Sequence, residues 1–379
     1  MDADERGFLS HPSWPKPSAL KSGLLLLLLG TIVGLLGAEV IIRWIMDGAI
    51  RTYSERMADP RFVINGKATP HIDRYRRGER YAFRLRSNYD EWHEDRIAGY
   101  RFHFRTNDEG FRQPVDLGEG VAKTGRKIMV IGDSLTFGHG SDYEGVWTTI
   151  LERRLNRGSG AVSSRREAVH VFNFGVGAWG FAEYYLTASR YRPLVNPDLT
   201  IVALFPPNDF HDLRATMWEG RDEGRLPSRI ERKDYYVDDD GHFHWGYAFR
   251  YPLLRESVAW ILFSDRFMLA WLKSDVKHTD DVAFSLMKAI AEGGRTLVLM
   301  IPAREQCEGA EDVRKEAFQR RLERAGFGPI VDLYSVFSAR DCRRLYFVKD
   351  PSHLTFEGNT LLADAVLQAL STYGISGRP

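Results

Sequence analysis

The sequence predicts an α/β fold, in which helices cover both faces of a parallel sheet, preceded by one N-terminal transmembrane helix. From residue 127 onward, short apolar runs alternate with segments of helical spacing, which is the pattern of a parallel sheet. Polar or glycine-rich segments follow several of these runs, at the strand ends where such sheets bind their ligands. Residues 22–42 are nearly all apolar and long enough to cross a bilayer.

The alternating part of the chain predicts five strands, with helices between them. The strands are expected at 127–131, 168–174, 199–205, 295–301 and 328–333, and the helices at 146–155, 181–191, 312–325 and 355–373. Residues 210–275 interrupt this rhythm and are rich in aromatic side chains. We expect an insertion there, with a hairpin at 235–245 and a helical segment at 252–272. Its aromatic residues suit a substrate groove or the packing of the insertion itself.

The apolar run Ser22–Ile42 carries one charged residue, Glu39. About 20 residues at roughly 1.5 Å each match the thickness of the hydrocarbon core. A core helix would show a polar face, and a signal peptide would have a shorter apolar run followed by a small-residue cleavage site. We therefore predict an uncleaved single-pass anchor at 22–46, preceded by a tail at 1–21.

The rest of the chain is predicted to form a polar, arginine-rich connector at 47–126 and a catalytic body at 127–379 with an insertion at about 210–275. Basic residues flank the anchor on both sides, so the positive-inside rule allows either orientation. Cys307 and Cys342 can form a disulfide, typical of an oxidising compartment, or remain two buried thiols.

The charge balance excludes some functions. Lys and Arg number 52 against 51 Asp and Glu, a formal net charge of +1, so the basic field of a general nucleic-acid binder is missing. Two cysteines are too few for a four-cysteine zinc site. His242, His244 and Asp238–Asp240 lie around the turn of the predicted hairpin, where solvated side chains are the simpler interpretation. We predict no metal, no cofactor and no nucleic-acid partner.

Polar groups follow three of the predicted strands. Ser134 lies in the segment 132–138 (GDSLTFG) directly after the first strand, where the next helix points its N-terminal amides. The glycines of Asn173–Gly180 after the second strand allow backbone amides to approach a ligand. Asn208, after the third, can donate to a developing oxyanion, or it can form a loop turn.

Asp350 and His353 stand three residues apart before the last predicted helix. At this spacing a carboxylate can fix the tautomer of the imidazole, which leaves the other ring nitrogen free to take a proton from a serine. Aspartate and serine also cap helices, so this tetrapeptide alone does not decide between the two roles.

Taken in order, these four segments resemble the blocks of the SGNH (GDSL) hydrolase family. The blocks read Gly132-Asp133-Ser134-Leu135, Asn173–Gly180, Asn208-Asp209 and Asp350-x-x-His353, and the resemblance extends from Lys127 to about Tyr373. The anchor and the Asn-x-x-Gly-Phe-Arg segment at 107–112 resemble a membrane-anchored bacterial branch of this family.

The resemblance implies a three-layer α/β/α flavodoxin-like domain with a serine mechanism. Ser134 would be the nucleophile, His353 the general base and then acid, and Asp350 the residue that orients the imidazole. The sequence also excludes the classical α/β-hydrolase elbow, because Thr136 stands where Gly-x-Ser-x-Gly requires glycine.

The resemblance further implies an oxyanion hole made by the Ser134 amide, an amide of Gly177 or Ala178, and the side chain of Asn208. Two positions depart from the family's pattern: Ala178 stands where a glycine donor is usual, and Pro206 where glycine is usual two residues before the asparagine. A backbone amide needs no particular side chain, so the first departure leaves the role intact.

We expect a membrane-anchored serine esterase that hydrolyses or transfers acyl groups through an acyl-serine. Its substrate would be an acylated small molecule or an envelope glycan or polysaccharide. The catalytic body would lie outside the cytoplasm, on the periplasmic side, although the flanking charges also permit a cytoplasmic body. The alternative is a non-catalytic glycan-binding or scaffold subunit that retains the fold, which would have no need of Ser134, Asp350 and His353 together. No protein partner is predicted.

Overall fold

The computed structural model describes residues 17–46, 52, 54, 72–74, 80–95, 98–157, 167–237, 243–245, 248, 251–268 and 279–373. Its centre is a five-stranded parallel sheet with the strand order β13-β12-β7-β5-β6. These strands are β5 (Arg126–Gly132), β6 (Val169–Gly175), β7 (Leu199–Leu204), β12 (Thr296–Met300) and β13 (Ile330–Asp332). Read from the far edge, the order along the chain is 2-1-3-4-5, that of flavodoxin-like folds, so the predicted fold class is confirmed.

Helices cover both faces of this sheet because successive strand residues point to opposite sides. In β5, Met129 and Ile131 join one buried cluster, while Ile128 and Val130 join the other. The first face is covered by α6 (Phe181–Val195), α10 (Thr279–Glu292) and α12 (Val313–Arg324), and the second by α5 (Trp147–Asn156) and α15 (Phe356–Thr372). The strands are therefore buried on both sides and read as continuous apolar runs.

The remaining elements lie between these strands and helices or before them. The helical ones are α1 (Pro17–Met46), α3 (Leu117–Ala122), α4 (Ser134–Phe137), α7 (Pro206–Ala215), α8 (Val258–Phe263), α11 (Arg304–Cys307), α13 (Tyr334–Ser338) and α14 (Cys342–Leu345), with a 3-10 turn at Tyr143–Gly145 and a π turn at Ser264–Met268. Antiparallel pairs are β1 (Ile72–Arg74) with β2 (Phe83–Leu85), β3 (Asp90–Asp95) with β4 (Tyr100–Arg105), β8 (Thr216–Arg221) with β9 (Pro227–Arg232), β10 (Tyr235–Val237) with β11 (Phe243–Trp245), and β14 (Tyr346–Phe347) with β15 (Asp350–Leu354).

The insertion differs in part from its predicted form. Strands β10 and β11 form the expected hairpin, whose turn, with His242 and Asp238–Asp240, lies outside the described residues. The expected helix at 252–272 is limited to α8 and the π turn as far as the structure describes it. Trp218, on the unpredicted hairpin β8–β9, packs against the buried core. That one aromatic residue therefore packs within the fold.

The region predicted as a polar connector takes part in the core. Tyr81, Phe83, Phe102, Phe104 and Phe111 are at most 3% exposed and belong to the same cluster as one face of the sheet. The strand β4 alternates between buried and more exposed residues, because its aromatic side chains all point to the same side. The described part of 80–122 is therefore a folded layer of the body. The domain boundaries themselves stay a prediction.

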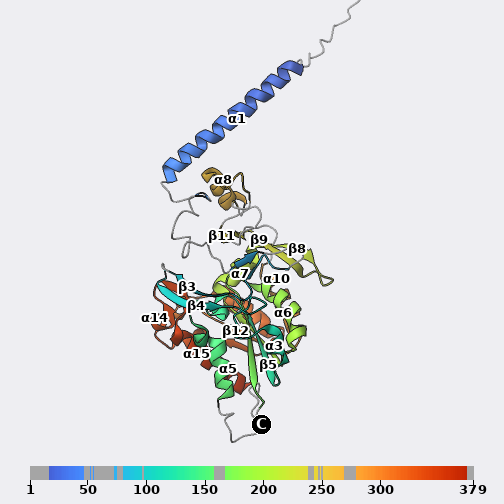
Figure 1. The fold of residues 1–379 in the computed structure, drawn as a ribbon, viewed down its shortest axis with the longest axis vertical. Coiled ribbons are helices and arrows are strands. Elements are labelled where there is room, and N and C mark those ends of the chain that lie inside the picture. The colour runs from blue at the N-terminus through green and yellow to red at the C-terminus, as the bar shows by residue number, and fades with distance from the viewer. Residues whose placement is uncertain are drawn as a thin grey trace, which may run out of the picture.

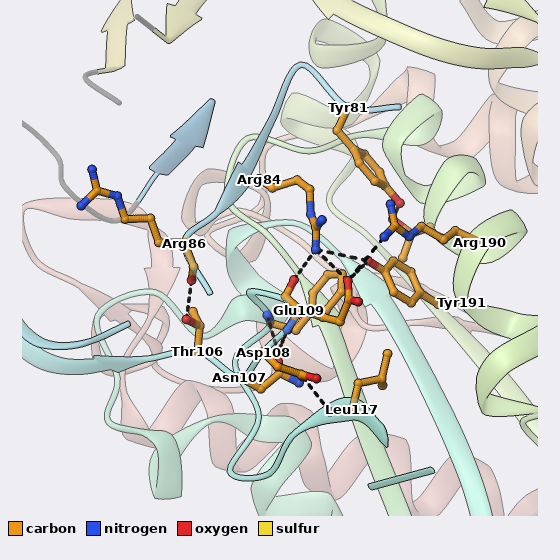
Figure 2. Close-up of polar contacts among 12 residues, drawn as sticks. Tyr81, Arg84, Arg86, Thr106, Asn107, Asp108, Glu109, Leu117, Arg190 and Tyr191 are labelled. Atoms are coloured by element: carbon orange, nitrogen blue, oxygen red, sulfur yellow. Dashed lines mark hydrogen bonds and ion pairs between the residues drawn. The ribbon is translucent and has the colours of Figure 1, made fainter. Parts of the chain in front are cut away.

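Polar contacts also tie this layer to α6 (Figure 2). The carboxylate of Glu109 accepts hydrogen bonds from Arg84 (2.8 Å) and from the Tyr191 hydroxyl (2.8 Å), and Arg190 lies 3.6 Å away. Arg84 also donates to the backbone carbonyl of Glu109. Because Tyr191 and Arg190 are on α6, this network fixes the segment before β5 against the main sheet.

The segment 106–112 forms an ordered turn that depends on Asn107 and Gly110. The side-chain oxygen of Asn107 accepts from the amides of Glu109 (3.1 Å) and Phe111 (2.9 Å). Gly110 has φ +79°, and a Cβ there would lie 2.4 Å from the Leu85 carbonyl oxygen, so only glycine fits.

This turn delivers Arg112 to the centre of the protein, where its side chain is fully buried. The guanidinium donates to the carbonyls of His103 (2.9 Å), Phe137 (3.2 Å), Gly138 (2.7 Å) and Ser141. Burial lowers the pKa of Arg112 to about 10, which still leaves it charged at neutral pH. One cation thereby connects β4 with the loop that follows α4.

Cys307 and Cys342 are joined in a disulfide, which decides between the two alternatives left by the sequence. It connects α11 to α14, the short helix that precedes β14 and β15.

At its other end the molecule extends into α1, which projects away from the sheet and has α8 beside its C-terminal end (Figure 1). The stretch Lys21–Met46 is long and apolar enough to cross a membrane by length and composition, and its large apolar side chains are exposed.

We predict that Arg112→Met lowers the free energy of unfolding by about 3 kcal/mol, because buried carbonyls lose a charged donor and gain no other partner. Urea denaturation of the full chain in detergent would measure this. Arg343→Met is the matched control, since Arg343 is exposed and should change stability by less than about 0.5 kcal/mol. Equal midpoints for the two variants would contradict the role assigned to Arg112.

Candidate active site

The three residues predicted as a catalytic set lie in one hydrogen-bonded chain. Nε2 of His353 is 2.8 Å from Oγ of Ser134, and Nδ1 of His353 is 2.6 Å from Oδ2 of Asp350. The side chains of His353 and Asp350 are 18% and 16% exposed. The sequence separates Ser134 from His353 by 219 positions, and the fold brings them into contact at the carboxyl edge of the sheet.

The strand order of the sheet places Ser134 at the site. It follows β5, whose neighbours are β6 and β7, at the point where the sheet reverses its winding and leaves a crevice. Asp133 caps the short helix α4 by accepting from the Leu135 amide (2.9 Å). A Cβ at Gly132 would lie 2.1 Å from the Thr136 hydroxyl, so glycine is needed for the sharp turn from strand to helix.

A fourth residue, Tyr100, contacts this chain from the N-terminal layer. Its hydroxyl donates to Oδ2 of Asp350 at 2.7 Å, the same oxygen that His353 contacts. Burial raises the pKa of Asp350. The hydrogen bond to His353 and the charge of His353 lower it, as do the Tyr100 hydroxyl and the Ser352 amide. These contributions outweigh burial and hold the pKa of Asp350 below its usual value. Asp350 therefore stays ionised throughout the neutral range.

Aromatic side chains pack against the imidazole of His353. The ring of His139 is 4.6 Å from that of His353, between centroids, and also contacts Tyr100 and Phe102. His139 comes from the loop after α4 whose carbonyls Arg112 holds. The orientation of His353 therefore depends on residues from both the predicted connector and the nucleophile loop.

The expected oxyanion residues surround Ser134 to different degrees. A Cβ on Gly177 would be 3.6 Å from that of Ser134, so this backbone runs directly past the nucleophile. Ala178 has φ +63°, a left-handed backbone that costs a non-glycine residue roughly 1 kcal/mol. That conformation explains why glycine is usual there. Which of the two amides faces an oxyanion stays a prediction.

Asn208 lies in the first turn of the helix α7, and not in the loop turn that the sequence left open as an alternative to the oxyanion role. Pro206 and Pro207 open that helix at positions where a missing N–H costs nothing, which accounts for the departure from glycine. The next residue, Asp209, is fully buried, and accepts from the Phe205 amide (2.7 Å) and the Tyr184 hydroxyl (2.8 Å). These two bonds fix the turn that carries Asn208.

Asp133, which precedes Ser134, and Asp209 are both buried carboxyl groups. Burial raises the pKa of both, and the charge of Asp133 raises the pKa of Asp209 further. The charge of His353 and the Asn208 side chain act in the opposite direction on the pKa of Asp133. Across the described residues, no group of three His, Cys, Asp or Glu could hold a metal ion.

Sequence reasoning missed Tyr100, His139 and Arg112. The alternation of aromatic and polar residues in Tyr100–Arg105 was a signal for a half-buried strand. Nothing in the sequence indicated that this strand would reach Asp350, 250 positions later.

No protein-family model matches the chain, and no curated protein matches it either. Solved structures with a similar fold include a lipolytic protein of the G-D-S-L family from Veillonella parvula (13% identity, TM-score 0.39, 65% of this chain and 98% of that one) and a lipase/acylhydrolase from Enterococcus faecalis (13%, 0.39, 65% and 96%). Another is a two-domain esterase active on acetylated mannans (12%, 0.40, 69% and 53%). The first carries the family name that the four sequence blocks resemble.

We predict that Tyr100→Phe slows the labelling of Ser134 by a fluorophosphonate about tenfold, since a hydrogen bond to a charged acceptor is lost. Without that hydroxyl the pKa of Asp350 rises, the carboxylate attracts the imidazolium proton more strongly, and the acid limb of the labelling rate moves to higher pH. Tyr89→Phe is the control, because the Tyr89 hydroxyl donates to Glu91 away from the site. An unmoved acid limb would reduce Tyr100 to a packing residue.

Proposed function

We propose that this protein is a membrane-anchored serine esterase that forms an acyl-enzyme on Ser134. The observation that carries the proposal is the continuous chain from Ser134 Oγ to His353 Nε2 (2.8 Å) and from Nδ1 to Asp350 (2.6 Å). Attack by a serine on an ester needs a base for its proton, and the base needs one fixed tautomer. Both requirements are met by this geometry.

The reaction would proceed in two halves. His353 takes the proton of Ser134 as Oγ attacks the acyl carbonyl, and then returns it to the leaving alcohol. Asp350 remains ionised and stabilises the imidazolium. The amides of Ser134 and of Gly177 or Ala178, with the Asn208 side chain, would hold the oxyanion. In the second half, water or the hydroxyl of a second substrate attacks the acyl-serine while His353 takes its proton. The bond from the acyl group to Ser134 Oγ breaks, and His353 returns the proton to Oγ. Attack by water makes the protein a hydrolase, and attack by a second substrate makes it an acyltransferase.

The helix α1 is long and apolar enough to anchor the chain in a membrane. The disulfide between Cys307 and Cys342, typical of an oxidising compartment, supports a body outside the cytoplasm. An acylated envelope glycan would be present on that side of the membrane, and similar solved structures include an esterase described as active on acetylated mannans. We therefore favour a glycan or polysaccharide ester as substrate.

The full chain in detergent should release p-nitrophenol from short acyl esters, and Ser134→Ala should reduce the rate by at least about a thousandfold. Ser352→Ala is the matched control, since Ser352 is next to His353 in sequence but contributes only its backbone amide to Asp350. Equal rates for wild type and Ser134→Ala would exclude the serine mechanism. Absence of hydrolysis and of fluorophosphonate labelling, with specific oligosaccharide binding, would favour the glycan-binding alternative.

Protease added to spheroplasts should digest the body of the protein, and alkylation before lysis should find no free thiol in it. Protection of residues beyond the anchor until the membrane is permeabilised would place the body in the cytoplasm. A cytoplasmic marker protein that stays intact serves as the control for membrane integrity.

A further inference from the structure

The C-terminal end of α1 is fixed to the insertion by one carboxylate. Glu39 accepts hydrogen bonds from the amides of Val258 and Ala259 (both 2.9 Å) and from the Ser257 hydroxyl (2.8 Å). Arg43, one turn further along α1, contacts Glu39 at 2.7 Å and donates to the Glu256 carbonyl at 2.9 Å. The start of α8 is therefore held at a defined height along the anchor.

The depth of Glu39 in the membrane can be estimated from the length of the helix. The apolar stretch Lys21–Met46 has 26 residues, or about 39 Å at 1.5 Å each, against a hydrocarbon core of about 30 Å. A core that begins at Ser22, directly after the charged Lys21, spans about 20 residues and ends near Ile41. Glu39 then lies close to the boundary between the hydrocarbon and the headgroups. The start of α8, which is hydrogen-bonded to Glu39, lies at the same depth.

The segment fixed there exposes large apolar side chains. Leu253 is 96% exposed and Phe267 66%, and Leu254 and Phe263 are also exposed. The rings of Trp260, Phe263 and Phe267 follow one another at centroid distances of 5.8 and 5.6 Å. Beside them Arg266 is exposed to solvent.

This composition fits one environment. Aromatic side chains and arginine are enriched where a bilayer meets water, since the rings enter the acyl boundary and the guanidinium reaches the headgroups. An exposed apolar surface in water would instead be a liability. Glu39 and Arg43 also hold the start of α8 against α1, where the neighbouring Val40 and Ile41 are exposed.

We propose that residues 251–268 lie in the headgroup region of the same bilayer that α1 spans, as a second, interfacial membrane contact set by Glu39. The inference rests on the anchor of the proposed function but not on the chemistry of Ser134. It implies that the insertion, for which the sequence left open a substrate groove or internal packing, holds the catalytic body against the lipid surface.

Single-cysteine labelling of the full chain tests this, because the described cysteines, Cys307 and Cys342, are already paired. An environment-sensitive fluorophore would be attached at Leu253→Cys or Phe267→Cys, and the protein reconstituted into phosphatidylethanolamine and phosphatidylglycerol vesicles. A lipid carrying a spin label near its headgroup should quench both positions at least about twofold. Leu28→Cys on α1 reports insertion of the anchor, and Val313→Cys, exposed on α12, should remain unquenched.

Quenching at Leu28→Cys but not at Leu253→Cys or Phe267→Cys would overturn the proposal and leave the anchor intact. Absence of quenching at all three would overturn both. A blue-shifted probe that lipid does not quench would indicate a protein partner in place of the bilayer, and would also overturn it. In a Glu39→Ala background the probe at Phe267→Cys should lose its quenching while that at Leu28→Cys keeps it. Retained quenching at Phe267→Cys would disprove that Glu39 sets the depth.

The same variants should hydrolyse a water-soluble ester at the wild-type rate. If the variants hydrolyse the ester but their probes are not quenched, only the membrane contact is refuted. If the probes are quenched but the ester is not hydrolysed, only the proposed esterase activity is refuted.

Discussion

The buried guanidinium of Arg112 connects the parts of the protein that must act together. It donates to carbonyls of β4 on one side and of the loop after Ser134 on the other. A charged group with no exposure is costly to bury unless it is hydrogen-bonded. The two terminal nitrogens of Arg112 donate to backbone carbonyls, although its Nε has no partner among the described residues, and these bonds restrict the backbone around them. The loop it holds carries His139, which packs on the imidazole of His353. The geometry of the site thus depends on a residue that contacts none of the reacting atoms.

The N-terminal layer, residues 80–122 as far as they are described, is part of the catalytic body and not only a connector. Residues 80–122 supply a buried aromatic surface, the Arg112 contacts and the hydroxyl of Tyr100 on Asp350. A carboxylate shared between an imidazole and a phenol has fewer possible orientations than one that contacts the imidazole alone. The layer therefore positions Asp350, and removing it would expose one face of the sheet core as well as the site.

The site and the anchor share one kind of interaction, a carboxylate that accepts hydrogen bonds from distant segments. Asp350 accepts them beside His353, and Glu39 accepts them between α1 and α8. The carboxyl edge of the parallel sheet carries Ser134, which contacts His353. In our proposals one such carboxylate serves the ester chemistry and the other fixes the depth of the body at a lipid surface.

Much of this could be predicted from the sequence because the signals were local. Alternating apolar runs indicate a parallel sheet, an apolar run of 21 residues indicates an anchor, and Ser134, Asp350 and His353 follow recognisable patterns at the ends of elements. The pairing of Cys307 with Cys342, the contact of Tyr100 with Asp350 and the capping of α8 by Glu39 were not predictable in this way. Each joins segments separated by between 35 and 250 positions, and no local pattern records which segments will meet. By itself, the sequence determined the fold class, the candidate nucleophile, the candidate base and the carboxylate that would orient it. Only the tertiary structure decided how they are held, because burial and hydrogen-bond geometry arise when the sheet and its layers pack together.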